Sequence, residues 1–176
     1  SRVKLYFMIG LPTETMEDVE GIPALGQKVI DAFYACKDRP KGPAVSVTVS
    51  AAAFVPKPFT PFQWAKMSTK EEFLEKAHLT KTAIREQLNQ KRIKYNWHEA
   101  DVTVLEGILA RGDRKVGDAI LKAYEHGALF DAWSEYYHPE YWKEAFAECG
   151  IDTDFYTIRE RSDDEIFPWD FIDAGV

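Results

Sequence analysis

The residue types that most often carry chemistry are sparse in this sequence, and none of them forms a catalytic or metal-binding motif. The two cysteines, Cys36 and Cys149, lie far apart and lack the close spacing that iron–sulfur or zinc ligation requires. We expect both to be buried small hydrophobic residues rather than reactive thiols. His78 stands alone beside an apolar helical stripe, and we expect it at the surface. The sequence has no Ser/His/Asp set and no phosphate-binding glycine loop.

The stretch KLYFMIGLPTET predicts the corner at which a functional site would form. A strand is expected over Lys4–Ile9, and because it is apolar on both faces it suits a parallel sheet that is covered on both sides. Gly10 permits a sharp turn at the end of this strand, and Pro12 prevents the strand from continuing. Thr15 then caps a helix, with Asp18 completing a capping box. In α/β folds, chemistry occurs at the end of the sheet where such corners lie.

The first strand, a helix and a second strand together predict one βαβ unit over about 50 residues. The helix is expected from Met16 to about Lys37, with a kink or restart at Pro23. The second strand is expected over about Ala44–Ala52, with valines on one face and Ser and Thr on the other. The hydroxyl-bearing face fits a barrel interior that is lined for a ligand, and it fits an ordinary half-exposed strand equally well. Such strand–helix–strand crossovers are right-handed in almost all cases.

Several separated segments resemble one enzyme family in the same order. KLYFMIGLPTET followed by MEDVEGI resembles the fifth-strand segment of radical S-adenosylmethionine (radical SAM) enzymes, which reads I-G-x-P-x-E-T after an apolar strand. Residues 45–64 are similar to the sixth strand and exit loop of one subgroup, the uncharacterised B12-binding-type proteins related to methylthiotransferases. LARGDRKVGDAI and the terminal PWDFIDAGV also resemble that subgroup, so that the resemblance covers nearly the whole chain.

The resemblance implies an α/β fold in which a βαβ piece of a partial TIM-type barrel is followed by a mostly helical extension. It divides the chain into residues 1–66, which hold the last strand units and exit loop, and residues 67–176, which are helical. It also implies that the adenine of S-adenosylmethionine contacts the ends of both strands. The residues carried over to that role are Met8, Ile9, Gly10, Phe54, Val55 and Pro56.

The sequence departs from the family at the motif that defines it. The CxxxCxxC loop that holds a [4Fe–4S] cluster is absent, so we expect a fragment whose upstream part supplies the cluster. S-adenosylmethionine and the cluster are then cofactors of the parent protein, and neither is expected on this fragment, which should not catalyse by itself. The subgroup typically has histidine where Phe59 and Phe171 stand, which removes two polar candidates for the site. We assign no catalytic residue and no metal ligand.

Two features keep a second interpretation open. The proline-rich segment FVPKPFTPFQW, residues 54–64, lies at the barrel mouth by resemblance, but its aromatic residues could instead simply pack against the barrel bottom or the helices. The region after residue 67 could act as a non-catalytic helical module that recruits a substrate or partner. Ser68 with Glu71 predicts the start of its first helix, and a short strand is possible through Ile93, Tyr95 and Trp97.

The later helices are marked by local capping signals. Asp101 and Asp113 are expected as caps of two successive helices, which end at Gly112 and Gly127. The Arg-Gly-Asp triplet at residues 111–113 is therefore interpreted as a helix end and a helix start. Arg111 and Arg114 are candidates for binding an anion or for pairing with the acidic segment at residues 152–165.

Composition limits the partners of the chain. The 176 residues include 22 basic and 29 acidic side chains, a net charge of −7, which gives no footprint for nucleic acid or anionic membrane. No signal peptide and no apolar run long enough to span a bilayer is seen, so a cytoplasmic location is expected. The expected partners are the remainder of the barrel and an unknown substrate. The open edges of a two-stranded sheet could also mediate self-association.

Overall fold

The computed structural model describes residues 1–39, 41–133, 135–173 and 175. Ala174 and Val176 of the terminal PWDFIDAGV segment lie outside the described residues. The chain forms two compact units: Ser1–Phe54 with Ser68–Ala100, and Val55–Met67 with Asp101–Val176. Residues 55–67 thus group with the C-terminal helices, and residues 68–100 group with the sheet.

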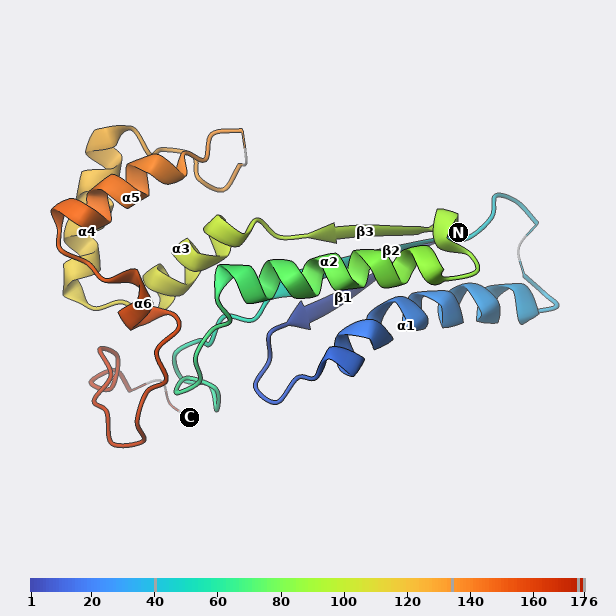
Figure 1. The fold of residues 1–176 in the computed structure, drawn as a ribbon, viewed down its shortest axis with the longest axis horizontal. Coiled ribbons are helices and arrows are strands. Elements are labelled where there is room, and N and C mark those ends of the chain that lie inside the picture. Colours follow the sequence, from blue (N-terminus) through green and yellow to red (C-terminus); the bar gives the residue numbers. More distant parts are fainter. Residues whose placement is uncertain (40, 134, 174, 176) are drawn as a thin grey trace. The chain divides into compact units, whose positions relative to one another are not determined.

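The first unit contains a parallel three-stranded sheet in the order β1-β2-β3 (Figure 1). The strands are β1 (Arg2–Ile9), β2 (Ser46–Ala53) and β3 (Ile93–Trp97), and the mixed α/β class expected from the sequence is confirmed. Tyr6 pairs with Ser50, which in turn pairs with Asn96 on β3. The sheet therefore has one strand more than the βαβ piece expected, because the short strand through Ile93 joins it.

Two helices connect the strands and share one face of the sheet. The helices α1 (Met16–Ala35) and α2 (Lys70–Glu86) contact each other along their lengths, as Figure 1 shows. The strand residues beneath them form the core with residues of both helices; its fully buried members include Ile9, Ile30, Val47, Val49 and Ala51. A short 3-10 helix, η1 (Gln90–Arg92), leads into β3.

The opposite face of the sheet is not covered by any described part of the first unit. Tyr6 is 75% exposed and Met8 is 48% exposed, although the sequence predicted a sheet covered on both sides. The burial pattern along β1 alternates strictly, with every second side chain exposed from Arg2 to Met8. The apolar character of Tyr6 and Met8 was therefore misleading, because both helices pack on the side of Leu5, Phe7 and Ile9.

The helices of the first unit begin close to the predicted residues, and three details differ from the prediction. Thr15 and Asp18 form the expected capping box at the start of α1. The box of α2 uses Thr69 and Glu72, one residue later than expected. No helix restart occurs at Pro23, since α1 runs without interruption from Met16 to Ala35. Cys36 is exposed rather than buried, because α1 has already ended when the chain reaches it.

The second unit is helical and has a core of its own. Its helices are α3 (Ala100–Arg111), α4 (Arg114–His126), α5 (Pro139–Glu148) and the short α6 (Thr153–Tyr156). The core combines aliphatic residues of α3 and α4 with aromatic residues of α5 and α6: Leu105, Ile108, Val116, Ala119, Ala123, Trp142, Ala145, Phe146 and Tyr156. Asp113 caps α4, and Gly127 ends it with φ of 112°, as expected. Asp101 lies inside α3 rather than capping it.

Candidate functional site

The corner after β1 is the most constrained turn of the first unit. Gly10 has φ of 92° and Thr13 has φ of 68°, so that two of four successive residues adopt the left-handed backbone region. A Cβ atom added to Gly10 would lie 2.6 Å from the Oγ atom of Ser68. The positive φ favours glycine at this position, and a larger residue would also have to displace the Ser68 hydroxyl.

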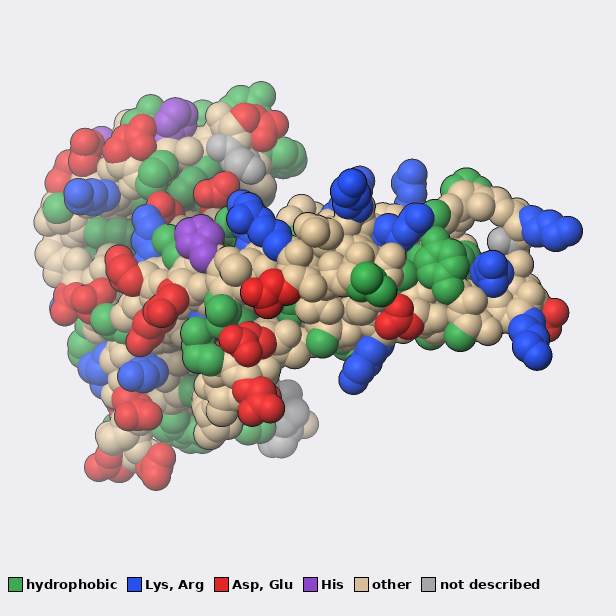
Figure 2. Space-filling view, turned by 45° about the vertical axis from the view of Figure 1, so that its right-hand side comes forward, with side chains coloured by type: hydrophobic (Ala, Val, Ile, Leu, Met, Phe, Trp, Pro, Cys, Tyr) green, Lys and Arg blue, Asp and Glu red, His purple; other side chains and the backbone are tan. Residues whose placement is uncertain are grey.

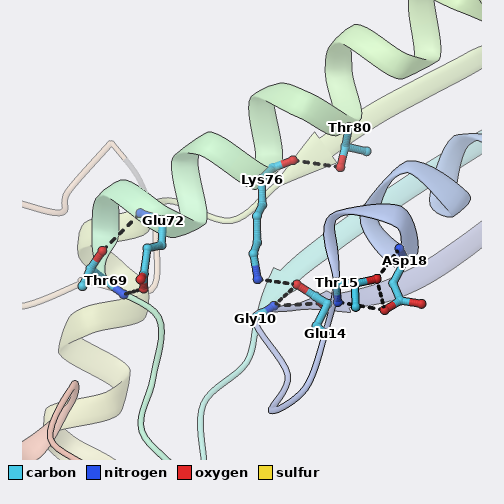
Figure 3. Close-up of polar contacts among 8 residues, drawn as sticks. All are labelled: Gly10, Glu14, Thr15, Asp18, Thr69, Glu72, Lys76 and Thr80. Atoms are coloured by element: carbon cyan, nitrogen blue, oxygen red, sulfur yellow. Dashed lines mark hydrogen bonds and ion pairs between the residues drawn. The ribbon is translucent and has the colours of Figure 1, made fainter.

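Glu14 holds the corner in place from inside the turn. Its two carboxylate oxygens accept the Gly10 N–H at 2.9 and 3.0 Å, and its Oε1 atom accepts from Lys76 Nζ at 2.7 Å (Figure 3). The side chains of Glu14 and Lys76 are only 7% and 18% exposed, so that this ion pair is largely shielded from water. The pair joins the corner of β1 to α2, 62 residues away in sequence. Sequence reasoning missed it, because no local pattern links the two positions.

The carboxyl ends of the three strands meet at the same edge of the sheet. The Phe54 N–H donates to the Ile9 carbonyl at 2.8 Å, which extends the pairing of β1 and β2 beyond their last residues. The His98 N–H donates to the Ala51 carbonyl at 3.2 Å and does the same for β3. These bonds fix the backbone on which a ligand at this edge would rest.

Four of the six residues expected to contact a cofactor gather at this edge. Ile9 and Phe54 are buried, Gly10 is half-buried at the turn, and the Met8 side chain is exposed on the open face of the sheet. Val55 and Pro56 belong to the second unit, where both are buried. The structure therefore brings Met8, Ile9, Gly10 and Phe54 together, and it describes the other two within a different unit.

The open face of the sheet carries polar side chains in register across the strands. Lys4, Thr48 and Lys94 form one row, and the next row consists of Tyr6, Ser50 and Asn96. The Lys4 Nζ atom lies 4.7 Å from the centre of the Tyr6 ring. This surface offers cations, hydroxyls and an amide to whatever covers the sheet.

The residues present do not fit an iron–sulfur cluster. Within the described ranges, no group of three or more His, Cys, Asp or Glu side chains could hold a metal ion. Cys36 and Cys149 are both free thiols. His78 is exposed, as expected, and its ring lies 5.9 Å from the ring of Trp97. Met8 presents an exposed apolar side chain beside the Gly10 corner.

Basic side chains recur over the part of the molecule that holds the first unit, on the right of Figure 2, where they alternate with apolar and acidic ones. No continuous basic surface of the kind that binds nucleic acid is seen on this face. Among the described residues, no helix has both the length and the apolar composition that a membrane crossing requires.

Comparison with known proteins gives one informative match. Over 119 residues, or 65% of this chain, the sequence is 32% identical to the uncharacterised protein MJ0966 of Methanocaldococcus jannaschii. The chain spans about a fifth of the length of this relative, since the alignment covers 22% of it. No family model matches the chain, and no solved structure matches it with significance.

Proposed function

We propose that this chain is the C-terminal part of a radical SAM iron–sulfur enzyme of the B12-binding-type subgroup, which cleaves S-adenosylmethionine reductively. The observation that carries the proposal is the parallel sheet whose connecting helices α1 and α2 both cover the same face. The motif resemblance at the corner after β1 supports the proposed reaction, and the parallel sheet is compatible with the proposed fold.

A parallel sheet with helices on only one face needs a further partner. Purely parallel sheets are normally covered on both sides, either by helices or by closing on themselves into a barrel. Here the open face carries Thr48 and Ser50 in register with Lys4, Tyr6, Lys94 and Asn96, and such polar side chains do not suit an apolar layer of helices. Two successive crossovers on the same side also match the way barrels are wound. Each half of a doubly wound sheet also has its crossovers on one side, so the choice of a barrel wall rests on the motif resemblance.

The edge of the sheet is where the adenine would bind. Met8 would contact the ring from the open face, while Ile9 and Phe54 keep the backbone dry and fixed behind it. Gly10 allows the backbone to approach closely, and the shielded contact between Glu14 and Lys76 preserves its shape. Val55 and Pro56 follow Phe54 in the chain but belong to the second unit, so the proposed contact with adenine rests on the four residues of the first unit. S-adenosylmethionine bound at a reduced cluster would supply the radical chemistry, and this chain would contribute binding and orientation.

The cluster and the other strands belong to another part of the parent protein. The relative from Methanocaldococcus jannaschii is several times longer than this chain, which leaves room for such a part. We therefore propose the remainder of the barrel as the principal partner of the open sheet, with an unknown substrate and a cytoplasmic location. Methylthiolation or another radical modification remains an analogy with the subgroup's relatives.

The proposal is tested on the parent polypeptide purified without oxygen and reconstituted with iron and sulfide. Electron paramagnetic resonance of the reduced protein should show a [4Fe–4S] signal that changes when S-adenosylmethionine is added. A parent sequence without a CxxxCxxC motif, or a cluster signal that is indifferent to S-adenosylmethionine, would contradict the proposal.

A non-catalytic recruitment role for the second unit is the alternative, and one observation favours it. A groove of about 560 Å³ lies between α3 and α5, and its lining includes Leu105, Ile108, Trp142 and Phe146 together with the charged Asp101, Glu140 and Lys143. The proline-rich segment also packs within this unit, where Trp64 contacts Phe167 with ring centres 5.7 Å apart. Calorimetry of the parent protein with S-adenosylmethionine separates the two roles, because measurable binding is expected of the radical enzyme and none is expected of a pure recruitment module.

A further inference from the structure

Two arginines of the second unit are almost completely buried. Arg111 ends α3 and is 1% exposed, and Arg161 lies in the C-terminal segment and is 5% exposed. Arg111 Nη1 donates to the Ala65 carbonyl at 2.6 Å, and Arg161 Nη2 donates to the Arg111 carbonyl at 3.0 Å. These bonds anchor both side chains, yet each bond uses only one of the three guanidinium nitrogens.

Three further nitrogens of the two guanidiniums are buried without a hydrogen-bond partner among the described residues. Arg111 Nε and Nη2, and Arg161 Nε, have no hydrogen-bond partner within the described part of the chain. On Arg111 these two nitrogens form the side edge of the guanidinium, which can donate in parallel to two oxygens of one carboxylate or phosphate. Burying such donors without an acceptor is costly, so that the geometry is suited to an oxyanion.

The buried charges around Arg111 and Arg161 are also unbalanced, with more guanidinium groups than carboxylates. Glu165 is the nearest carboxylate, but it binds Arg159 through two contacts at 2.7 and 2.8 Å and stays 3.9 Å from Arg161 Nε. Three guanidinium groups therefore share one carboxylate. Burial and the charge of Arg161 lower the pKa of Arg111 to about 10, which reflects the same deficit.

Aromatic rings pack against the guanidinium of Arg161 and leave its edge for a ligand. The Cζ atom of Arg161 lies 5.2 Å from the ring centre of Phe167 and 5.3 Å from that of Trp169, so that aromatic rings cover its face. The acidic segment of this unit is largely exposed, and water and salt screen its carboxylates beyond roughly 8–10 Å. Buried donors are screened far less, and they therefore decide what binds here.

We propose that Arg111 and Arg161 form a binding site for a phosphate group, either free phosphate or a small phosphate monoester. A planar carboxylate would satisfy the side edge of Arg111 alone. A tetrahedral dianion has further oxygens for Arg161 and offsets two positive charges rather than one. The site lies within the second unit and does not depend on the proposed radical chemistry.

The test is a titration of the full chain with inorganic phosphate and, separately, with glycerol phosphate, at constant ionic strength set by chloride. We expect saturable heat in calorimetry and a melting temperature that rises with ligand concentration. Tighter binding of the monoester identifies a phosphorylated small molecule, whereas equal or tighter binding of inorganic phosphate identifies the free ion. Absence of saturable binding for both ligands, or binding of acetate as tight as that of phosphate, overturns the proposal.

Matched variants locate the site. Arg111→Lys keeps the charge but removes the side edge, and we expect at least a tenfold loss of phosphate affinity. Arg114→Lys changes an exposed arginine of the same unit and should bind as the wild type does. Equal affinity in Arg111→Lys would contradict the proposal. If that variant does not fold, the wild-type titration still decides whether the chain binds phosphate. Arg161→Lys then tests whether phosphate binds at this site, and it should also lose phosphate affinity.

Discussion

Both carboxylate oxygens of Glu14 accept the backbone N–H of Gly10, at 2.9 and 3.0 Å. The Glu14 side chain thus bridges the turn at the end of β1. Lys76 on α2 neutralises the charge of this carboxylate. This contact makes the corner rigid before any ligand arrives. The edge proposed to bind adenine is therefore preorganised by a charge that faces away from solvent.

Removing the charge of Glu14 should weaken the first unit. In Glu14→Gln the amide oxygen can still accept from Gly10, but the shielded ion pair with Lys76 is lost. We expect the free energy of unfolding to fall by about 1–3 kcal/mol, measured by urea denaturation. Glu17→Gln, at an exposed position of α1, should change it by less than about 0.5 kcal/mol. Equal effects of the two substitutions would contradict a structural role for the pair.

Gly10 and Gly21 should respond in opposite directions to alanine. Gly10→Ala places a Cβ atom 2.6 Å from Ser68 Oγ at φ of 92°, and should destabilise by about 1–3 kcal/mol. Gly21 lies inside α1 with no atom within 4 Å of an added Cβ, so Gly21→Ala should stabilise by about 0.5–1 kcal/mol. Thermal unfolding of both variants gives the comparison. A neutral Gly10→Ala would show that the corner tolerates ordinary residues.

The contact of Arg159 with Glu165 should make the second unit sensitive to acid. The hydrogen bonds from Arg159 lower the pKa of Glu165 below its ordinary value of about 4.3, despite an opposing effect of burial. A lowered folded-state pKa gives stability that is present above the unfolded pKa and is lost as the pH falls through the folded one. The free energy of unfolding of the wild type should therefore decline below about pH 4.5 more steeply than that of Glu165→Gln. Parallel curves for the two proteins would contradict this contribution.

Met8 should distinguish the ligand edge from the rest of the surface. In the parent protein, Met8→Trp fills the space beside Gly10 and should weaken S-adenosylmethionine binding by about tenfold or more in calorimetry. Leu88→Trp, at a position that is 89% exposed, should leave binding unchanged. Because neither side chain is part of the buried core, both variants should unfold near the wild-type temperature. Unchanged affinity in Met8→Trp would remove Met8 from the proposed site.

The sequence was most informative where structure is local. The corner at Gly10 and the box of Thr15 with Asp18 depend on neighbours within a few residues, and both were predicted correctly. The start of α2 was displaced by one residue, because Ser68-x-x-Glu71 and Thr69-x-x-Glu72 satisfy the same capping pattern. The local pattern does not decide whether Ser68 or Thr69 becomes the N-cap of α2.

Contacts between residues far apart in the sequence could not be predicted from local sequence patterns. Nothing in the sequence pairs Glu14 with Lys76, and nothing shows that Arg111 would be buried against the Ala65 carbonyl. The open face was also missed, because exposed Tyr6 and Met8 have the same residue types as a covered strand. Burial on a sheet depends on which side the crossover helices take, and a single strand does not encode that choice.

The central claim is that the edge of this sheet binds S-adenosylmethionine in a radical enzyme. The most direct measurement is the formation of 5′-deoxyadenosine by the reconstituted parent protein under a strong reductant, followed by liquid chromatography. The account predicts 5′-deoxyadenosine that requires both the reductant and the cluster, and that falls at least tenfold in Met8→Trp at subsaturating S-adenosylmethionine but not in Leu88→Trp. Intact S-adenosylmethionine after prolonged reduction of a protein with a full cluster would contradict it.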